Sequence, residues 1–309
     1  MKPGTSRPRR MPVVVTGAAG FIGRRVVSQL ADAGLQVWAV DRMPAPKDLS
    51  AAVEYRRADL GSGSGWLPDM GGDHFTLVHL AWNMNRADTG GQTASVGDFT
   101  RLLEALPGRG LRAVVGLGSA EEYGEREGCL REDQAPGARL SAYGQAKHEA
   151  CRALEAWSRA DGRPAVWLRP FIVYGPGQGG DMVVPYALRC AREHRPAEFT
   201  EALQLRDFIH ADDVAGGIVQ AVARVAETAE GFAVCNLGRG EPVRLRDVLE
   251  RIARQTGAED LFRFGVRPMR PDEPQAQFAD RTAAEFRLGW RARISWKKGV
   301  DTLCRGGAE

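Results

Sequence analysis

Residues 13–23 read VVVTGAAGFIG, and this stretch decides the fold. Three consecutive β-branched valines are typical of a buried parallel strand. Gly17, Gly20 and Gly23 follow at even spacing, and an apolar run of helical period comes next. A strand, a glycine turn and a helix in this order form the context that a dinucleotide-binding fingerprint requires.

The three glycines have separate physical roles in such a turn. Gly17 lets the chain turn tightly off the strand, Gly20 leaves room for a pyrophosphate beside the backbone, and Gly23 lets the helix lie close to the sheet. The free N–H groups at the start of the helix then face the phosphates. An ordinary glycine-rich turn is the alternative, and the flanking strand and helix argue against it.

The chain has 309 residues, a formal net charge of +3 and a hydrophobic fraction of 43%. This composition is that of a soluble globular protein of one or two domains, which we expect to be cytoplasmic. The small charge gives no reason to expect a nucleic-acid partner, and no apolar run is long enough for a membrane span.

We interpret residues 1–10, which are basic and lack an apolar signal segment, as a disordered tail. The cysteines and histidines show no metal-ligand spacing, so we expect reduced thiols and no metal.

Strand-like and helix-like segments alternate along the chain. Strands are expected at 36–40, 53–57, 75–81, 112–117, 198–200 and 232–235, and helices at 93–106, 141–160, 182–194, 212–226 and 243–256. This alternation predicts an α/β fold with a doubly wound parallel sheet. His79 lies inside an apolar strand, and we interpret it as a satisfied core histidine.

Asp41 follows the second expected strand, about twenty residues after the glycines. A carboxylate there accepts hydrogen bonds from the ribose hydroxyls of NAD and repels the 2′-phosphate of NADP. Arg42 is the opposing signal, because an arginine can pair with that phosphate. The position of the carboxylate favours NAD over NADP.

A Tyr-x-x-x-Lys pair opens the helix expected at 141–160. Tyr143 and Lys147 are four residues apart, so they project from the same side of the helix. A lysine ammonium near a phenol lowers the phenol pKa, which would let the tyrosine act as acid or base near neutral pH. Ser119 stands at the carboxyl end of a strand, where ligands bind in open α/β sheets. By spacing alone, a surface helix pair is the alternative.

Together these motifs resemble the extended short-chain dehydrogenase/reductase family, the NAD-dependent epimerase/dehydratase group that acts on nucleotide sugars. Besides the glycines, Ser119, Tyr143 and Lys147, the resemblance rests on LRPFIVYGPGQ at 168–178, RDFIHADDV at 206–214, CNLG at 235–238 and LGWR at 288–291. It covers residues 11–303 and implies a Rossmann fold, a nucleotide-sugar substrate and a homodimer formed by the helices near 93–106 and 141–160. The implied NAD-binding domain is 11–170, to which 207–236 returns, and the smaller substrate-binding subdomain is 171–206 and 237–309.

The resemblance also implies roles for individual residues. Tyr143 would be the acid/base at a sugar hydroxyl or ketone, Lys147 would hold the nicotinamide ribose, and Ser119 would hydrogen-bond the reacting oxygen. The residues that would contact the cofactor are Gly17, Gly20, Phe21, Ile22, Gly23, Asp41, Arg42, Asp59, Leu60, Leu80, Ala81, Tyr143, Lys147 and Pro170. Those that would contact the substrate are Ser119, Ile172, Arg206 and Arg270.

An arginine's fixed fork of donors matches the oxygens of a diphosphate, which is the role that the resemblance implies for Arg206 and Arg270. The alternative for Arg206 is a structural ion pair with Asp207 or Asp212.

Two departures from the family pattern bear on the reaction. Ile172 stands where family members often have an asparagine that contacts the substrate. Glu121 matches a catalytic glutamate of sugar 4,6-dehydratases, but Ala120 replaces the residue that commonly protonates their leaving hydroxyl. Residues 121–124, Glu-Glu-Tyr-Gly, also resemble the sequence of some 4-keto-6-deoxysugar reductases.

We therefore expect a nucleotide-sugar epimerase that oxidises and re-reduces C4 with a hydride recycled on NAD. A ketoreductase that consumes an external reduced cofactor needs the same Ser119, Tyr143 and Lys147, and is the second hypothesis. A dehydratase with Glu121 as the base for a carbon-bound proton is the third. A cofactor-binding protein without activity is the non-enzymatic alternative.

Overall fold

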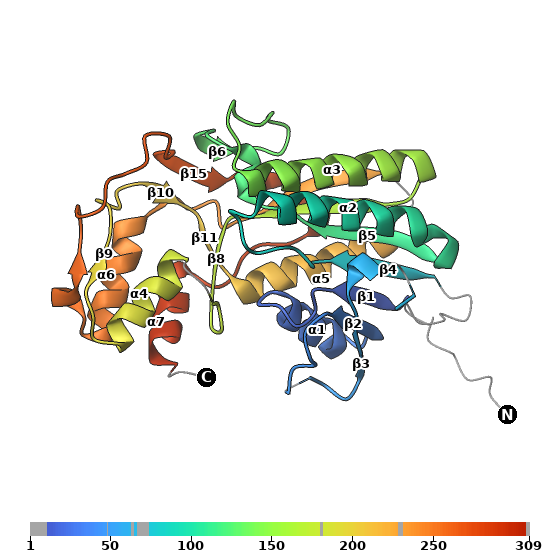
Figure 1. The fold of residues 1–309 in the computed structure, drawn as a ribbon, viewed down its shortest axis with the longest axis horizontal. Coiled ribbons are helices and arrows are strands. Elements are labelled where there is room, and N and C mark those ends of the chain that lie inside the picture. Colours follow the sequence, from blue (N-terminus) through green and yellow to red (C-terminus); the bar gives the residue numbers. More distant parts are fainter. Residues whose placement is uncertain are drawn as a thin grey trace.

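The structure is a computed structural model that describes residues 11–47, 49–62, 65–66, 74–179, 182–227 and 231–306. The expected tail at 1–10 lies outside the described residues. A large sheet with its helices occupies one side of the molecule, and shorter strands and helices occupy the other (Figure 1).

A parallel seven-stranded sheet forms the larger part, in the order β12-β7-β5-β4-β1-β2-β3. Its strands are β1 (Val13–Thr16), β2 (Val37–Asp41), β3 (Val53–Arg57), β4 (Phe75–His79), β5 (Leu111–Leu117), β7 (Ala165–Pro170) and β12 (Phe232–Leu237). This topology confirms the doubly wound sheet. The strand order reverses between β1 and β4, and in such folds ligands bind in the crevice that opens at the carboxyl ends there.

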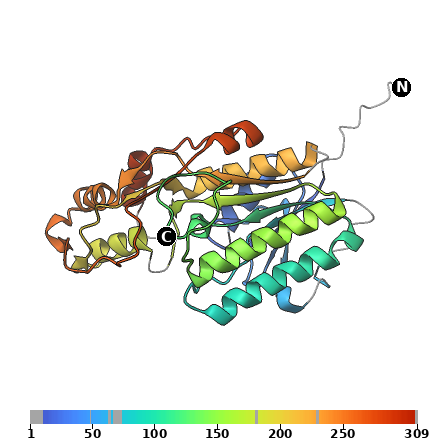
Figure 2. The same cartoon turned by 90° about the horizontal axis from the view of Figure 1, so that it is seen from above.

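Helices cover both faces of this sheet (Figure 2). They are α1 (Gly23–Asp32) and α5 (Ala211–Glu227) on one face, and α2 (Thr89–Ala105) and α3 (Ala142–Asp161) on the other. Val13 and Val15 belong to the apolar core under α1 and α5, whereas Val14 belongs to the core under α2 and α3. Alternate residues of β1 therefore serve opposite cores, which explains why three consecutive positions of the strand are valine.

His79, the last residue of β4, is a buried core histidine as interpreted, but it is only partly satisfied, because its Nε2 has no hydrogen-bond partner among the described residues. Its Nδ1 lies 2.9 Å from Thr16 Oγ1, and its ring stacks on Phe99 with the centroids 4.4 Å apart. Burial lowers the His79 pKa to about 3, so the ring is neutral at physiological pH.

Short strands and three helices form the smaller part. The strands are β13 (Val243–Arg244), β10 (Leu205–Arg206), β15 (Ala276–Ala279) and β6 (Gly128–Leu130) in one sheet, β8 (Ile172–Tyr174) with β11 (Phe208–His210), and β9 (Ala197–Glu198) with β14 (Phe262–Arg263). The helices are α4 (Val183–Arg192), α6 (Leu245–Thr256) and α7 (Trp296–Arg305). Tyr174, Leu188 and Ile252 belong to a separate apolar core here.

Short turns complete the described fold. Single-turn helices lie at η1 (Leu60–Ser62), η2 (Pro107–Arg109), η3 (Ala120–Tyr123) and η4 (Glu259–Leu261), and a π-helical turn lies at η5 (Ala284–Leu288). Among the helices of the described ranges, none is both long and apolar enough to cross a membrane. All five cysteines fall within those ranges, and each is a free thiol.

Several expected boundaries differ from the structure by a few residues, and two of the differences have a local reason. Helix α2 begins at Thr89 rather than 93, because the Asp88 carboxylate caps it by accepting a hydrogen bond from Gly91 N at 2.9 Å. Helix α6 begins at Leu245, since the two residues before it pair with β10. The strand expected at 198–200 is β9 at Ala197–Glu198, and the strand expected at 75–81 ends at His79.

Candidate active site

The glycine turn after β1 packs tightly against the end of β4. Gly17 has a φ of +71°, and a Cβ on it would lie 2.6 Å from Ala81 N. A Cβ on Gly23 would collide with the carbonyl oxygen of Gly17. Neither position therefore accepts a larger residue without a shift of the backbone. Phe21 and Ile22 continue the turn, and Ile22 occupies the N-cap of α1 with no polar side chain to cap the helix itself.

The Asp41 carboxylate ties the tip of β2 to this turn. Its Oδ2 accepts a hydrogen bond from Ala19 N at 3.0 Å, and its Oδ1 accepts one from Met43 N at 3.0 Å. Each carboxylate oxygen has a further acceptor position. The neighbouring Arg42 is exposed, and its carbonyl accepts from Arg57 Nε. The structure thus brings Asp41 to the place where the ribose contact is predicted, and that contact stays a prediction.

The remaining predicted cofactor residues lie along the same carboxyl edge of the sheet. Leu80 and Ala81 follow β4 directly, and Leu80 N donates to Thr16 O at 3.1 Å. Asp59 and Leu60 follow β3, where the Asp59 carboxylate accepts from Gly61 N at 2.9 Å. Pro170 is the last residue of β7 and is buried.

Taken together, this edge of the sheet fits a dinucleotide. A glycine turn with no room for side chains approaches a helix N-terminus, which is suited to a pyrophosphate, and a carboxylate follows at the next strand tip.

Ser119 lies just beyond β5, as the N-cap of the turn η3. Its Oγ accepts a hydrogen bond from Glu121 N at 3.1 Å, and its own N–H donates to Glu122 Oε1 at 2.9 Å. These two bonds form a capping box, which fixes the serine backbone.

Glu122 is a supporting residue that our sequence reasoning missed. It is 1% exposed, and besides Ser119 it accepts hydrogen bonds from Trp167 Nε1 and Arg169 Nε, both at 2.8 Å. Arg169 is itself 5% exposed, so this is a buried ion pair between η3 and β7. The Ser-x-x-Glu spacing of a capping box was the available signal, although it does not reveal the arginine.

Tyr143 and Lys147 lie on the buried side of α3, one turn apart, as predicted. Lys147 Nζ donates to Leu117 O at 2.7 Å and lies 3.6 Å from the centroid of the Trp82 ring. Burial lowers the Lys147 pKa to about 7, an effect that Arg86 reinforces and Glu122 opposes.

The expected lowering of the Tyr143 pKa is wrong for the protein alone. Burial raises this pKa to about 12, while Arg86 and a hydrogen bond with Ser119 act to lower it. The cause is geometric, since Lys147 Nζ points to the Leu117 carbonyl and lies 5.8 Å from the tyrosine ring centroid.

Glu121, the residue expected as a base in a dehydratase, has a partner on each carboxylate oxygen. Oε1 pairs with Arg86 Nη1, and Oε2 accepts from Ser141 Oγ at 2.8 Å. Arg86 comes from the loop between β4 and α2, and no pattern in the sequence marked it.

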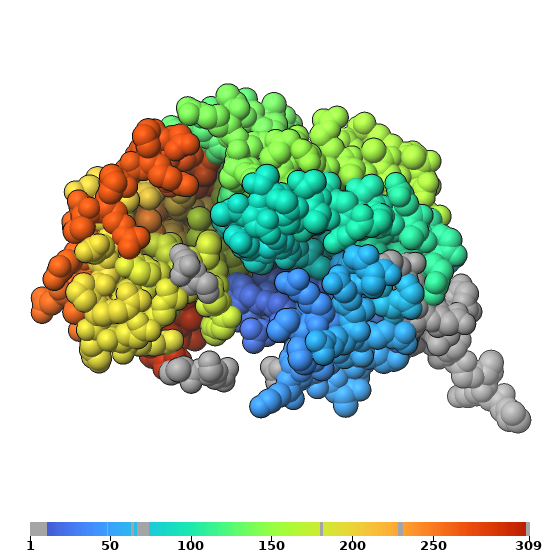
Figure 3. All heavy atoms as spheres, viewed as in Figure 1, coloured from blue at the N-terminus to red at the C-terminus, as the bar shows by residue number. Residues whose placement is uncertain are grey.

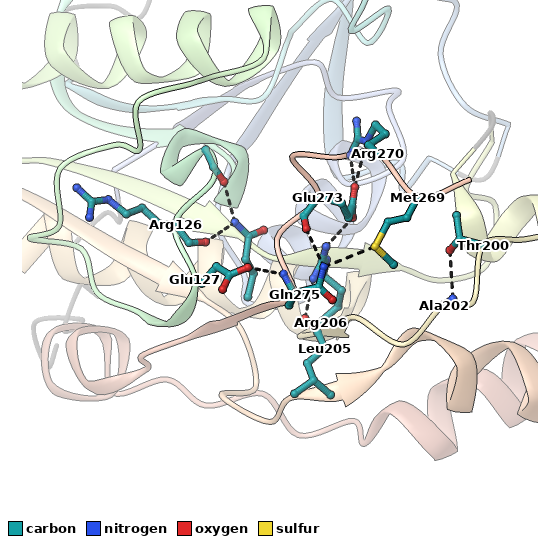
Figure 4. A network of polar contacts seen from close by, with 12 residues as sticks. Arg126, Glu127, Thr200, Ala202, Leu205, Arg206, Met269, Arg270, Glu273 and Gln275 are labelled. Carbon is teal, nitrogen blue, oxygen red and sulfur yellow. Dashed lines mark hydrogen bonds and ion pairs between the residues drawn. The ribbon is translucent and has the colours of Figure 1, made fainter. Parts of the chain in front are cut away.

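Arg206 and Arg270 meet at one carboxylate, that of Glu273 (Figure 4). Arg206 Nη2 lies 2.5 Å from Glu273 Oε1, and Arg206 is 7% exposed. The alternative pairing of Arg206 with Asp207 or Asp212 is therefore wrong. Asp207 accepts from backbone N–H groups that include those of residues 239 and 240, and Asp212 pairs with Arg25 at 2.8 Å.

A groove of about 660 Å³ adjoins this arginine pair. Its lining residues are Glu125, Arg126, Glu127, Gly137, Ala138, Arg139, Pro271, Asp272, Glu273 and Pro274. Apart from this groove, Figure 3 shows the surface hollowed where the blue and teal elements of the first half meet the yellow elements of the second. Ile172 lies in β8, half-buried, with its N–H bonded to Asp207 O at 2.9 Å.

Known proteins with the same arrangement identify the family. The model of the NAD dependent epimerase/dehydratase family matches residues 13–238. The solved structure of MoeE5 in complex with UDP-glucuronic acid and NAD superposes with a TM-score of 0.82 at 33% identity, covering 95% of this chain and 97% of MoeE5. A second MoeE5 structure contains UDP-glucose and NAD.

Two curated relatives extend over nearly the whole chain. The UDP-glucose 4-epimerase of Streptomyces lividans is 27% identical over 300 residues, which are 90% of each chain. The CDP-abequose synthase of Salmonella muenchen is 26% identical over 305 residues, 94% of this chain and 96% of that one. On these matches, and with the expected motifs in place on the expected sheet, the chain belongs to the NAD-dependent epimerase/dehydratase family of extended short-chain dehydrogenases/reductases.

Proposed function

We propose that this protein is a UDP-sugar 4-epimerase that retains NAD and recycles the hydride within one active site. The observation that carries the proposal is that Ser119, Tyr143 and Lys147 converge at the carboxyl edge of the sheet, beside the glycine turn. The S. lividans relative and the ligands of MoeE5 support the nucleotide and the class of reaction.

In this proposal the protein's own residues divide the work. Tyr143 removes the proton from the C4 hydroxyl and returns it after the sugar has turned, while Ser119 hydrogen-bonds the same oxygen. Lys147 and Asp41 hold the two riboses of the cofactor. The bound NAD supplies a hydride acceptor, so that the configuration at C4 is lost and reset without net oxidation. The Arg206–Arg270 pair binds the diphosphate, which places the sugar over the tyrosine.

The dehydratase hypothesis has less support. Arg86 and Ser141 each hold one oxygen of the Glu121 carboxylate, so each oxygen keeps one acceptor position rather than two. Ala120 also offers no proton to a leaving hydroxyl. The ketoreductase hypothesis uses the same Ser119, Tyr143 and Lys147, so cofactor content separates it from the epimerase.

Two measurements test the proposal. Protein purified and then denatured should release near-stoichiometric NAD, identified by chromatography. Incubation with UDP-glucose, and separately with UDP-glucuronic acid, should produce a mixture of C4 epimers by proton NMR without added cofactor. An empty protein that turns over 4-keto sugars only with added NADPH would instead establish the ketoreductase. Bound NAD with no change in any nucleotide sugar would contradict both.

Replacing Arg206 by alanine should raise the KM for the UDP-sugar by on the order of ten- to a hundredfold and change kcat less. The reason is the loss of one charge-assisted hydrogen bond to the diphosphate, at about 1.5–3 kcal/mol. Steady-state kinetics measure both parameters. Arg254→Ala removes an exposed arginine of α6 that pairs with Glu250, and should leave KM unchanged. An unchanged KM in Arg206→Ala would remove the diphosphate role.

A further inference from the structure

The loop that carries Arg86 is hydrogen-bonded to helix α2. Within that loop Trp82 Nε1 donates to Gln92 Oε1 at 2.7 Å, and Gln92 Nε2 donates to Asn83 O at 3.0 Å and Asn85 O at 2.9 Å. Gln92 belongs to α2 and is 1% exposed. The buried side-chain amide of Gln92 therefore fixes the backbone at Asn83 and Asn85, just before Arg86.

The guanidinium of Arg86 lies over the face of the Tyr143 ring. Its Cζ is 4.7 Å from the ring centroid, within the range of a cation–π interaction. The ion pair with Glu121 holds the guanidinium there, and Ser141 holds Glu121 by a 2.8 Å hydrogen bond. Ser141 is the N-cap of α3, the helix that carries Tyr143. The hydrogen bonds and the ion pair therefore connect Arg86 to the helix whose tyrosine ring it covers.

Arg86 differs from Lys147 in two respects. It is the nearer cation, since Lys147 Nζ lies 5.8 Å from the same ring centroid. It is also a guanidinium, with a planar fork of donors that pairs with Glu121, whereas burial lowers the pKa of the Lys147 ammonium to about 7.

We propose that Arg86 is a positioning residue for catalysis, which stabilises the phenolate of Tyr143 from the face of the ring while Glu121 fixes its place. The charged groups around Tyr143 are Arg86 from the β4–α2 loop, Glu121 and Glu122 from η3, and Lys147 from α3. Arg86 favours the phenolate and Glu121 opposes it, so the two charges act in opposite directions on the ionisation of Tyr143. This inference rests on the proposed role of Tyr143 as the acid/base.

Opposite shifts in two variants test the inference. Arg86→Gln should move the ionisation of Tyr143 upward by about one pH unit, because it removes the favourable cation and leaves Glu121 unpaired. Glu121→Gln should move it downward, and the double variant should lie between the two. Arg86→Lys keeps the positive charge, and its Tyr143 pKa should lie between those of Arg86→Gln and the wild type. If Arg86 and Glu121 had a purely structural role, both variants would lose activity or stability, and the Tyr143 ionisation would not shift in opposite directions.

The shifts are measured on the full-length NAD-loaded protein as the fraction of phenolate, by ultraviolet absorbance, at fixed pH values below the Tyr143 pKa of about 12, because NAD is hydrolysed in strong alkali. Subtracting the titration of each variant's Tyr143→Phe counterpart isolates Tyr143 from the four other tyrosines. The pH profile of kcat/KM for the UDP-sugar should shift in the same directions. Arg159→Gln breaks an exposed ion pair with Glu155 on the same helix and should move neither measurement.

Identical ionisation in wild type, Arg86→Gln and Glu121→Gln, or shifts of the same sign, would overturn the inference. The phenolate titration does not depend on turnover. If no UDP-sugar reacts, the proposed function fails while the opposed shifts still decide the role of Arg86.

Discussion

Tyr143→Phe should reduce 4-epimerisation by about 10²–10⁴-fold while the protein keeps its fold and its bound NAD. The substitution removes only the hydroxyl that exchanges the C4 proton. The ring itself is 6% exposed and makes its packing contacts and the stacking with Arg86 without that oxygen. Loss of turnover with retained cofactor therefore separates proton transfer from cofactor binding.

The measurement is proton NMR of the UDP-sugar over time, together with chromatography of the nucleotide released on denaturation. Tyr186→Phe is the matched control, because it makes the same chemical change on α4, where the hydroxyl accepts from Glu198 N at 3.3 Å. That variant should turn over as wild type does. Retention of more than about a tenth of the turnover by Tyr143→Phe would contradict the role of the phenol, since general acid–base catalysis contributes at least 10²-fold.

Glu122→Ala should lower the free energy of unfolding by about 3–5 kcal/mol. The change leaves the Arg169 guanidinium buried without its counter-charge and takes the acceptor from Trp167 Nε1 and Ser119 N. Each effect has the same sign, because every one of these donors is enclosed by η3 and β7, away from water.

Urea unfolding measures this change. Glu155→Ala removes a glutamate whose ion pair with Arg159 is on the surface of α3, and should alter stability by less than about 0.5 kcal/mol. A Glu122→Ala protein as stable as Glu155→Ala would show that the buried pair contributes nothing net. A loss of turnover in Glu122→Gln that exceeds its loss of stability would indicate that the carboxylate also places Ser119.

Local patterns were sufficient to predict the central sheet and the positions of the proposed catalytic side chains. The valines of β1 alternate between two buried cores, so an uninterrupted run of valines indicates a strand buried on both faces. Gly17 and Gly23 are required by close approach of backbone atoms, and Tyr143 and Lys147 share a face because of helical period. Each of these features depends on residues that are close in sequence.

The ion pairs and the pKa values were decided by the tertiary structure. Arg206 pairs with Glu273, which is 67 residues away, rather than with the adjacent Asp207, because Asp207 is turned toward backbone N–H groups. Arg86 reaches Tyr143 from a loop, and burial outweighs the nearby cations in setting the pKa of the phenol.

The physical reason is the range of the two kinds of interaction. Backbone conformation and the periodicity of side chains depend on neighbouring residues. The sequence by itself therefore determined the sheet, the glycine turn and the shared face of Tyr143 and Lys147. Desolvation and charge pairing depend on which distant segments converge at the carboxyl edge of the sheet, and only the folded chain decides that.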